Sequence, residues 1–158
     1  MTDREKVAAL VEKARVLYQG KVVGHRSCGI ALAETFGRPT PAYQALRAGG
    51  ITGEGTCGSV LAGQLLLGEL LGDPDPRGQV TDALREAMVW YQAEIARRLN
   101  RGGSPTLVCG DLTGRFPVFH SAERLDFCTD IVTLVAEVVA QALLRVGAAL
   151  PDAPIPER

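Results

Sequence analysis

The chain contains few aromatic residues and few histidines. Only 5% of its 158 residues are Phe, Trp or Tyr, and only two are histidines. Its core must therefore consist mostly of Ala, Leu and Val, which favour closely packed helices. Proteins that bind single-stranded nucleic acids often stack bases on aromatic rings, and this chain has little material for that.

Concentrated charge of one sign is also missing. The formal net charge is −1, and the Lys and Arg residues are scattered along the chain. Nucleic-acid binding usually depends on a basic stripe that displaces counterions. Binding to an anionic membrane surface depends on a polybasic segment. We therefore expect neither nucleic acid nor membrane among the partners.

No leader or membrane span is expected either. Residues 1–6 include acidic side chains and lack the apolar core of a signal peptide. The most apolar stretch, residues 131–150, is interrupted by Glu137, Gln141 and Arg145, which disfavours a transmembrane helix. These features predict a cytoplasmic protein in a reducing compartment. Cysteines there more often bind metals or act in catalysis than form structural disulfides.

Apolar residues recur at helical intervals along most of the chain. This pattern predicts an all-α fold: a single-domain bundle of about five main helices over residues 1–147, followed by a mobile, Pro-rich tail over residues 148–158. The first expected helix begins with a capping box formed by Thr2 and Glu5, and it ends at Gly20 or Gly24. The next expected helices are Cys28–Phe36, a short one over Pro41–Ala48, Cys57–Leu71, Arg77–Asn100 and a short one that contains Cys109. Ser121 caps the last expected helix, which ends near Val146.

The helix over residues 57–71 is apolar on nearly all sides, so we expect it to be the buried central helix. Its three glycines, Gly58, Gly63 and Gly68, each cost about 1 kcal/mol of helix propensity relative to Ala. Close approach of a neighbouring helix or of a cofactor would account for them.

The chain has four cysteines: Cys28, Cys57, Cys109 and Cys128. All but Cys109 fall in the first turns of expected helices, where free N–H groups and the helix dipole favour thiolate. No two are spaced as C-x-x-C, so neither a thioredoxin-type dithiol nor a zinc ribbon follows. Only folding can bring the four together, and each could instead pack as a small apolar side chain.

The sequence around the cysteines resembles a known family. The segments that carry the resemblance are, in order, Ser27-Cys28-Gly29-Ile30-Ala31, the glycine loop 49–55 with Cys57-Gly58-Ser59-Val60-Leu61-Ala62-Gly63, Val108-Cys109-Gly110-Asp111-Leu112, and Phe127-Cys128-Thr129-Asp130-Ile131-Val132. They resemble the C_GCAxxG_C_C family, small helical proteins with four cysteines that are described as redox-active. The resemblance covers roughly residues 20–145. It departs from the family pattern after Cys57, where Ser59 replaces Ala and the last glycine comes one position late, at Gly63.

The resemblance implies a redox or metal-binding role. Four thiolates fit an iron–sulfur cluster, with tetrahedral zinc as the variant. We expect Cys28, Cys57, Cys109 and Cys128 to be the ligands. Gly55 and Gly58 should let backbone N–H groups approach sulfur and tune the potential of the cluster. Covalent c-type haem is not supported, because the chain has no C-x-x-C-H.

The expected function is that of a small cytoplasmic redox protein that exchanges electrons with an unidentified partner protein. Whether it turns over a substrate stays open. One alternative is a metal-free thiol–disulfide oxidoreductase, which needs an accessible thiol of low pKa. The other is a non-catalytic helical interaction domain that forms a homodimer, with its cysteines as core filler.

A few other residues are weaker candidates. His25 and His120 can ligate metal or lower a thiol pKa, although exposed loop histidines are common. Glu54 can act as a carboxylate ligand, or it can simply complement the N-terminus of the next helix. Trp90 can mark a helix or dimer contact, whereas Tyr91 belongs to a core stripe. No catalytic triad or H-E-x-x-H motif is present.

Overall fold

The computed structural model describes all 158 residues and is helical, with 58% helix and no strand. This confirms the all-α prediction. In chain order the elements are α1 (Asp3–Gln19), α2 (Cys28–Thr35), the 3₁₀ helix η1 (Pro41–Leu46), α3 (Gly58–Leu71), α4 (Asp82–Arg98), α5 (Cys109–Thr113) and α6 (Ala122–Arg145).

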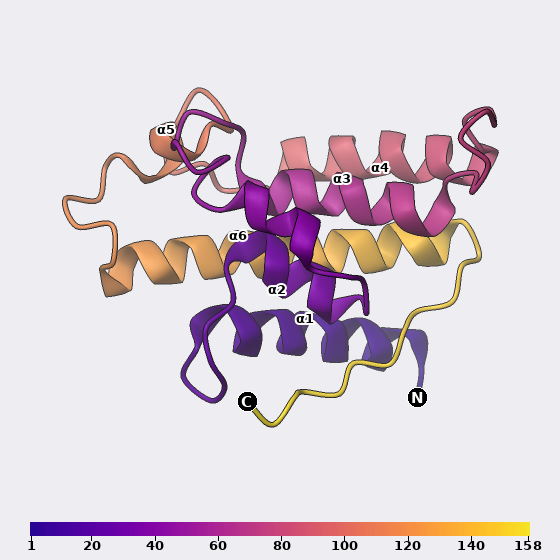
Figure 1. The fold of residues 1–158 in the computed structure, drawn as a ribbon, viewed down its shortest axis with the longest axis horizontal. Helices are drawn as coiled ribbons and strands as arrows, with labels where there is room; N and C mark the ends of the chain where they lie inside the picture. Colours follow the sequence, from indigo (N-terminus) through magenta and orange to yellow (C-terminus); the bar gives the residue numbers. More distant parts are fainter.

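Helix α6 runs the length of the molecule, with α1 on one side and α3 and α4 on the other (Figure 1). It contacts α1, α2, α3 and α4, and its buried side chains recur every three or four residues. The expectation that the helix over residues 57–71 lies at the centre is not confirmed. Leu65 and Leu70 of α3 are exposed, at 46% and 36%, so this helix has one outward face.

Helix caps explain where the elements begin. Thr2 and Glu5 form the predicted capping box of α1, and Ser121 caps α6 as predicted. Helix α4 begins at Asp82 rather than Arg77, because the Thr81 hydroxyl accepts the Leu84 N–H at 3.1 Å. By contrast, α2, α3 and α5 have no hydrogen bond from a capping side chain.

By length and composition alone, α6 is apolar enough to cross a membrane. A core helix that packs on several neighbours passes the same test. Most of the apolar stretch of α6 is buried by the rest of this domain.

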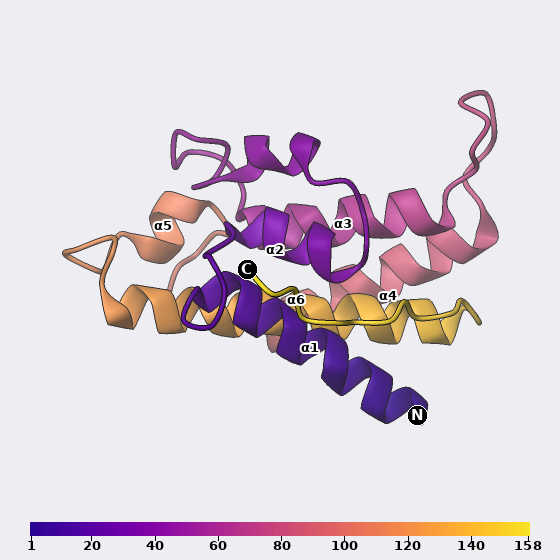
Figure 2. The ribbon, with the colours of Figure 1, turned by 60° about the horizontal axis from the view of Figure 1, so that its bottom comes forward.

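The segment after α6 has no regular secondary structure and turns back across α1 (Figures 1 and 2). Leu150 and Ala153 pack against the core, and Arg26 donates a 2.8 Å hydrogen bond to the Arg158 carbonyl. These contacts hold the segment against the domain at several points. The mobility expected for residues 148–158 stays a prediction.

Close packing of two helices accounts for one glycine of α3. A Cβ atom at Gly63 would lie 2.1 Å from the Tyr91 hydroxyl oxygen of α4. Tyr91 is fully buried, and its hydroxyl donates to the Val60 carbonyl at 2.8 Å. Gly63 therefore lets α4 approach α3, whereas a Cβ at Gly68 would meet only open space.

These two glycines predict opposite effects of alanine. We expect Gly63→Ala to lower the free energy of unfolding by about 1–3 kcal/mol, because the methyl group would displace Tyr91. Gly68→Ala should raise it by up to about 1 kcal/mol through helix propensity alone. Urea unfolding measures both, and equal gains in stability would contradict the close contact at Gly63.

Candidate functional site

All four cysteines line one cavity of about 300 Å³. It lies at the end of the molecule that holds α5 and the loops around it (Figures 1 and 2). Cys28 is the first residue of α2, Cys57 is the N-cap of α3, and Cys128 lies in the second turn of α6. Cys109 begins α5, rather than lying a turn into it as predicted. Folding thus brings together thiols from four separate parts of the chain, and all four are free.

Backbone hydrogen bonds between two irregular segments place Cys57 beside Cys109. The Cys57 N–H donates to the Leu107 carbonyl at 2.7 Å, and the Cys109 N–H donates to the Gly55 carbonyl at 2.9 Å. Thr56 forms an isolated antiparallel bridge with Val108. Cys57, which the sequence analysis made the first residue of this helix, therefore takes the N-cap position, and α3 begins at Gly58.

Gly55 and Gly58 lie differently with respect to the cavity. Gly58 lines the cavity, and a Cβ there would lie 2.4 Å from the Leu46 carbonyl oxygen and 3.0 Å from Cys28 Sγ. Gly55 does not line the cavity, and its N–H donates to the Gly49 carbonyl rather than toward sulfur. Its contribution is to hold Cys109 in place through its own carbonyl.

The cavity wall carries two arginines but no acidic side chain. Arg47 and Arg124 line it together with His25 and His120, and no Asp or Glu does. The hydroxyl of Ser27, which also lines it, is buried without a hydrogen-bond partner. A buried polar atom of this kind usually has a partner, so the wall is suited to a polar or anionic guest.

Burial controls the protonation of the thiols. It raises the pKa of Cys28 from its ordinary value of 9.0 to about 12, and the neighbouring Cys57 adds to the rise. Burial likewise raises the pKa of Cys57 and of Cys109. The N–H groups of Val60 and Ser59 oppose the rise at Cys57 but do not overcome it. The expectation that helix N-termini make these thiols acidic is therefore wrong for the metal-free protein, because desolvation outweighs the N-terminal groups.

No three Cys, His, Asp or Glu side chains are close enough together to hold a single metal ion. The four thiols instead surround a cavity of about 300 Å³. A mononuclear zinc site needs all its sulfurs about 2.3 Å from one point. Soft sulfur donors suit either zinc or iron–sulfur chemistry.

The two histidines lie in loops and line the cavity, and both are exposed. The Nδ1 atom of His25 hydrogen-bonds the Tyr18 carbonyl, while the His120 ring packs edge-on against Phe119. Glu54 is exposed and does not line the cavity.

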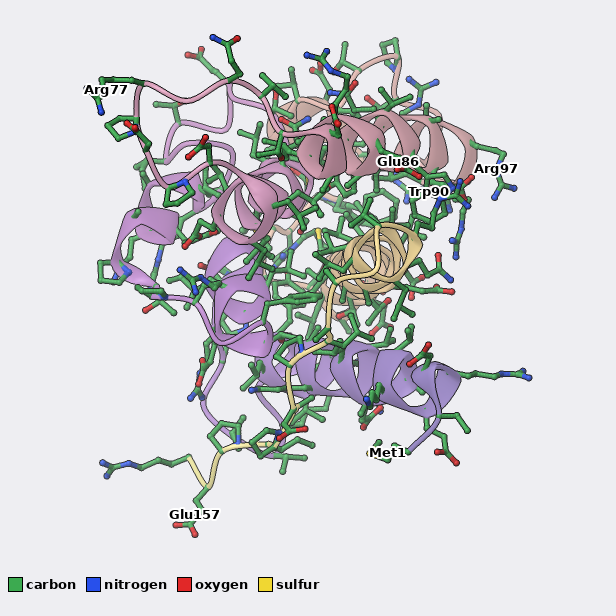
Figure 3. All side chains as sticks on the ribbon, turned by 90° about the vertical axis from the view of Figure 1, so that its right-hand side faces the viewer. Met1, Arg77, Glu86, Trp90, Arg97 and Glu157 are labelled. Atoms are coloured by element: carbon green, nitrogen blue, oxygen red, sulfur yellow. The ribbon has the colours of Figure 1, made fainter.

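The remaining candidates, Trp90 and Tyr91, do not line the cavity. Trp90 lies toward α6, where Arg145 stacks on its ring at 5.1 Å (Figure 3). Tyr91 is fully buried, as its place in a core stripe predicted.

Sequence reasoning missed several polar residues of the cavity, among them Tyr18 and Arg124. Tyr18 lies in the apolar stripe of α1, where nothing distinguishes it from a core residue. Arg124 had a usable signal, because it precedes Cys128 by four residues and so shares its helix face.

No protein-family model matches the chain, and no curated protein or solved structure matches it either. The resemblance to the C_GCAxxG_C_C family is therefore neither supported nor refuted, and it stays a prediction.

The raised thiol pKa values predict how the stability of the metal-free protein depends on pH. The unfolded chain releases thiol protons near pH 9.0, whereas folded Cys28 keeps its proton up to about pH 12. The folded state binds more protons in this window, so the free energy of unfolding should fall as the pH rises from about 9 toward 12.

Anaerobic urea unfolding at several pH values checks this. Comparison with Cys28→Ser isolates the contribution of that thiol, because the variant should lose stability less steeply over the same window. Equal slopes for the two proteins would contradict the assignment.

Proposed function

We propose that this protein is a small redox protein whose cysteines hold an iron–sulfur cluster. Cys28, Cys57, Cys109 and Cys128 would be the thiolate ligands. The observation that carries the proposal is that all the cysteines of the chain line one cavity, although they come from four different elements. A cluster bound there would accept and release single electrons. We further propose that it exchanges them with a partner protein in the cytoplasm.

We favour a cluster over zinc because the cavity that the four cysteines line, about 300 Å³, is larger than a single ion requires. A single ion would have to draw all four sulfurs inward, since no three metal-binding side chains lie close enough to share one. A cluster reaches outward to its ligands from several metal atoms. Zinc stays the variant that metal analysis would reveal.

The surroundings of the cysteines also suit a bound cluster. The N–H groups of Ser59 and Val60 lie at the Cys57 sulfur, where hydrogen bonds raise the reduction potential of a cluster. The buried side chain of Leu112 and that of Ile131 line the cavity and limit the access of water. The close fit of Gly58 against Leu46 keeps α3 near Cys28.

The metal-free oxidoreductase is less well supported. Rapid thiol–disulfide exchange needs an accessible thiol whose pKa is low. Burial raises the pKa of three of the four thiols here. A dimerisation domain with filler cysteines would not need all of them on one cavity wall.

Anaerobic reconstitution with iron and sulfide tests the proposal. We expect brown protein with iron and sulfide in equal amounts and with visible absorption that dithionite bleaches. Each Cys→Ser variant should lose most of this absorption, because each removes one ligand. His25→Asn and His120→Asn are the matched controls and should keep it.

Other outcomes of this experiment are also decisive. Colourless protein with one zinc per chain would support the zinc variant. Protein that takes up neither iron nor zinc, and that forms an intramolecular disulfide quickly at neutral pH, would contradict the cluster and support the function of a metal-free oxidoreductase.

A further inference from the structure

Arg124 is a buried cation without a carboxylate partner. It is 8% exposed, and Lys13 is the only other buried charged residue of the chain. Arg124 takes part in no salt bridge, and no Asp or Glu lines the cavity that it borders. Burying an unpaired charge is costly, so native proteins normally supply a counter-charge. Only the cysteines and the Tyr18 phenol on the cavity wall can ionise to supply one.

Neutral groups hold the guanidinium in place. Its Nη1 donates to the Tyr18 hydroxyl at 2.8 Å, and its Nε donates to the Phe119 carbonyl. The group also stacks on the Phe119 ring, 4.2 Å from the centroid. None of these contacts neutralises the charge: burial raises the pKa of Tyr18, so this side chain stays an uncharged phenol. The charge is fixed on the cavity wall beside Cys128.

We propose that Arg124 is the counter-cation of the four-cysteine centre, where it raises both the retention and the reduction potential of a bound cluster. This inference rests on the proposed function. Four thiolates carry more negative charge than an oxidised cluster core carries positive charge, and reduction adds one more negative charge. A fixed positive charge in a poorly solvated site therefore favours binding, and it favours the reduced state further.

Position distinguishes Arg124 from the other arginine of the wall. Arg47 is exposed, so solvent and salt screen its charge. Arg124 is the only arginine of the cavity wall whose side chain is buried. Removal of its charge should therefore change the potential far more than removal of the charge of Arg47.

The test is an anaerobic redox titration of the reconstituted protein with dithionite as the reductant. Arg124→Gln should shift the midpoint potential to more negative values. A tenfold weaker reduction equilibrium corresponds to about 59 mV for one electron. Arg124→Lys keeps the charge and should stay near the wild-type potential, and Arg47→Gln should also change it little. Iron retained after desalting measures cluster binding in the same samples, and Arg124→Gln should retain less.

A second pair of variants keeps the test decisive if Arg124→Gln does not fold. Phe119 lies in an exposed loop over the guanidinium. Phe119→Glu would bring a carboxylate to Arg124 and neutralise it, so the potential should again become more negative. Phe119→Gln is the uncharged control and should not reproduce the shift.

The outcomes separate this inference from the proposed function. If the wild-type protein takes up no cluster, both fail. If every variant holds a cluster at the wild-type potential, the cluster stands and the role of Arg124 is overturned. Equal shifts in Arg124→Gln and Arg124→Lys would also overturn it, because they would show that the hydrogen bonds to Tyr18 and Phe119 matter rather than the charge.

Discussion

The four-cysteine cavity depends on backbone hydrogen bonds between the loop that precedes α3 and the segment that leads into α5. Residues 53–57 and residues 107–110 bond to each other through the N–H groups of Cys57, Cys109 and Gly110. Two thiols about fifty residues apart are thereby fixed by main-chain atoms, which do not depend on side-chain rotamers. Helices α2 and α6 then add Cys28 and Cys128 by packing on the same end of α3. The glycines of these segments permit the close approach: a Cβ at Gly49 would lie 2.4 Å from the Cys109 Cβ.

Two opposing effects decide the charge of the thiols, and their magnitudes decide which one wins. A helix N-terminus stabilises a nearby negative charge by about 0.3–1 kcal/mol, which is less than one pKa unit. Full burial can shift a pKa by about 3–5 units. Cys28 follows the larger effect, since its pKa rises to about 12. Cys28 therefore stays neutral in the metal-free protein, and a metal bound as proposed would have to displace its proton, which would couple loading of the site to proton release.

The sequence predicted the helices well because each depends on local signals. The capping box of Thr2 and Glu5 and the cap at Ser121 are short-range patterns, and both were found as predicted. The wall of the cavity depends on long-range packing instead. Tyr18 reaches the cavity only because α1 packs on α6, and the N-cap role of Cys57 follows from the bridge between Thr56 and Val108. Neither contact can be predicted from the residues that neighbour Tyr18 or Cys57 in the sequence.

The two buried cations of the domain, Lys13 and Arg124, differ in whether an acidic side chain lies near them. Lys13 lies near Glu34, whose charge opposes the lowering of the Lys13 pKa by burial. Arg124 has only uncharged partners, and the buried thiols around its cavity are neutral at physiological pH. Charge in this part of the domain is therefore unbalanced in the metal-free protein. On the proposed function, ionisation of the cysteines around a cluster would balance it, and the same event would both create the ligands and supply the counter-charge for Arg124.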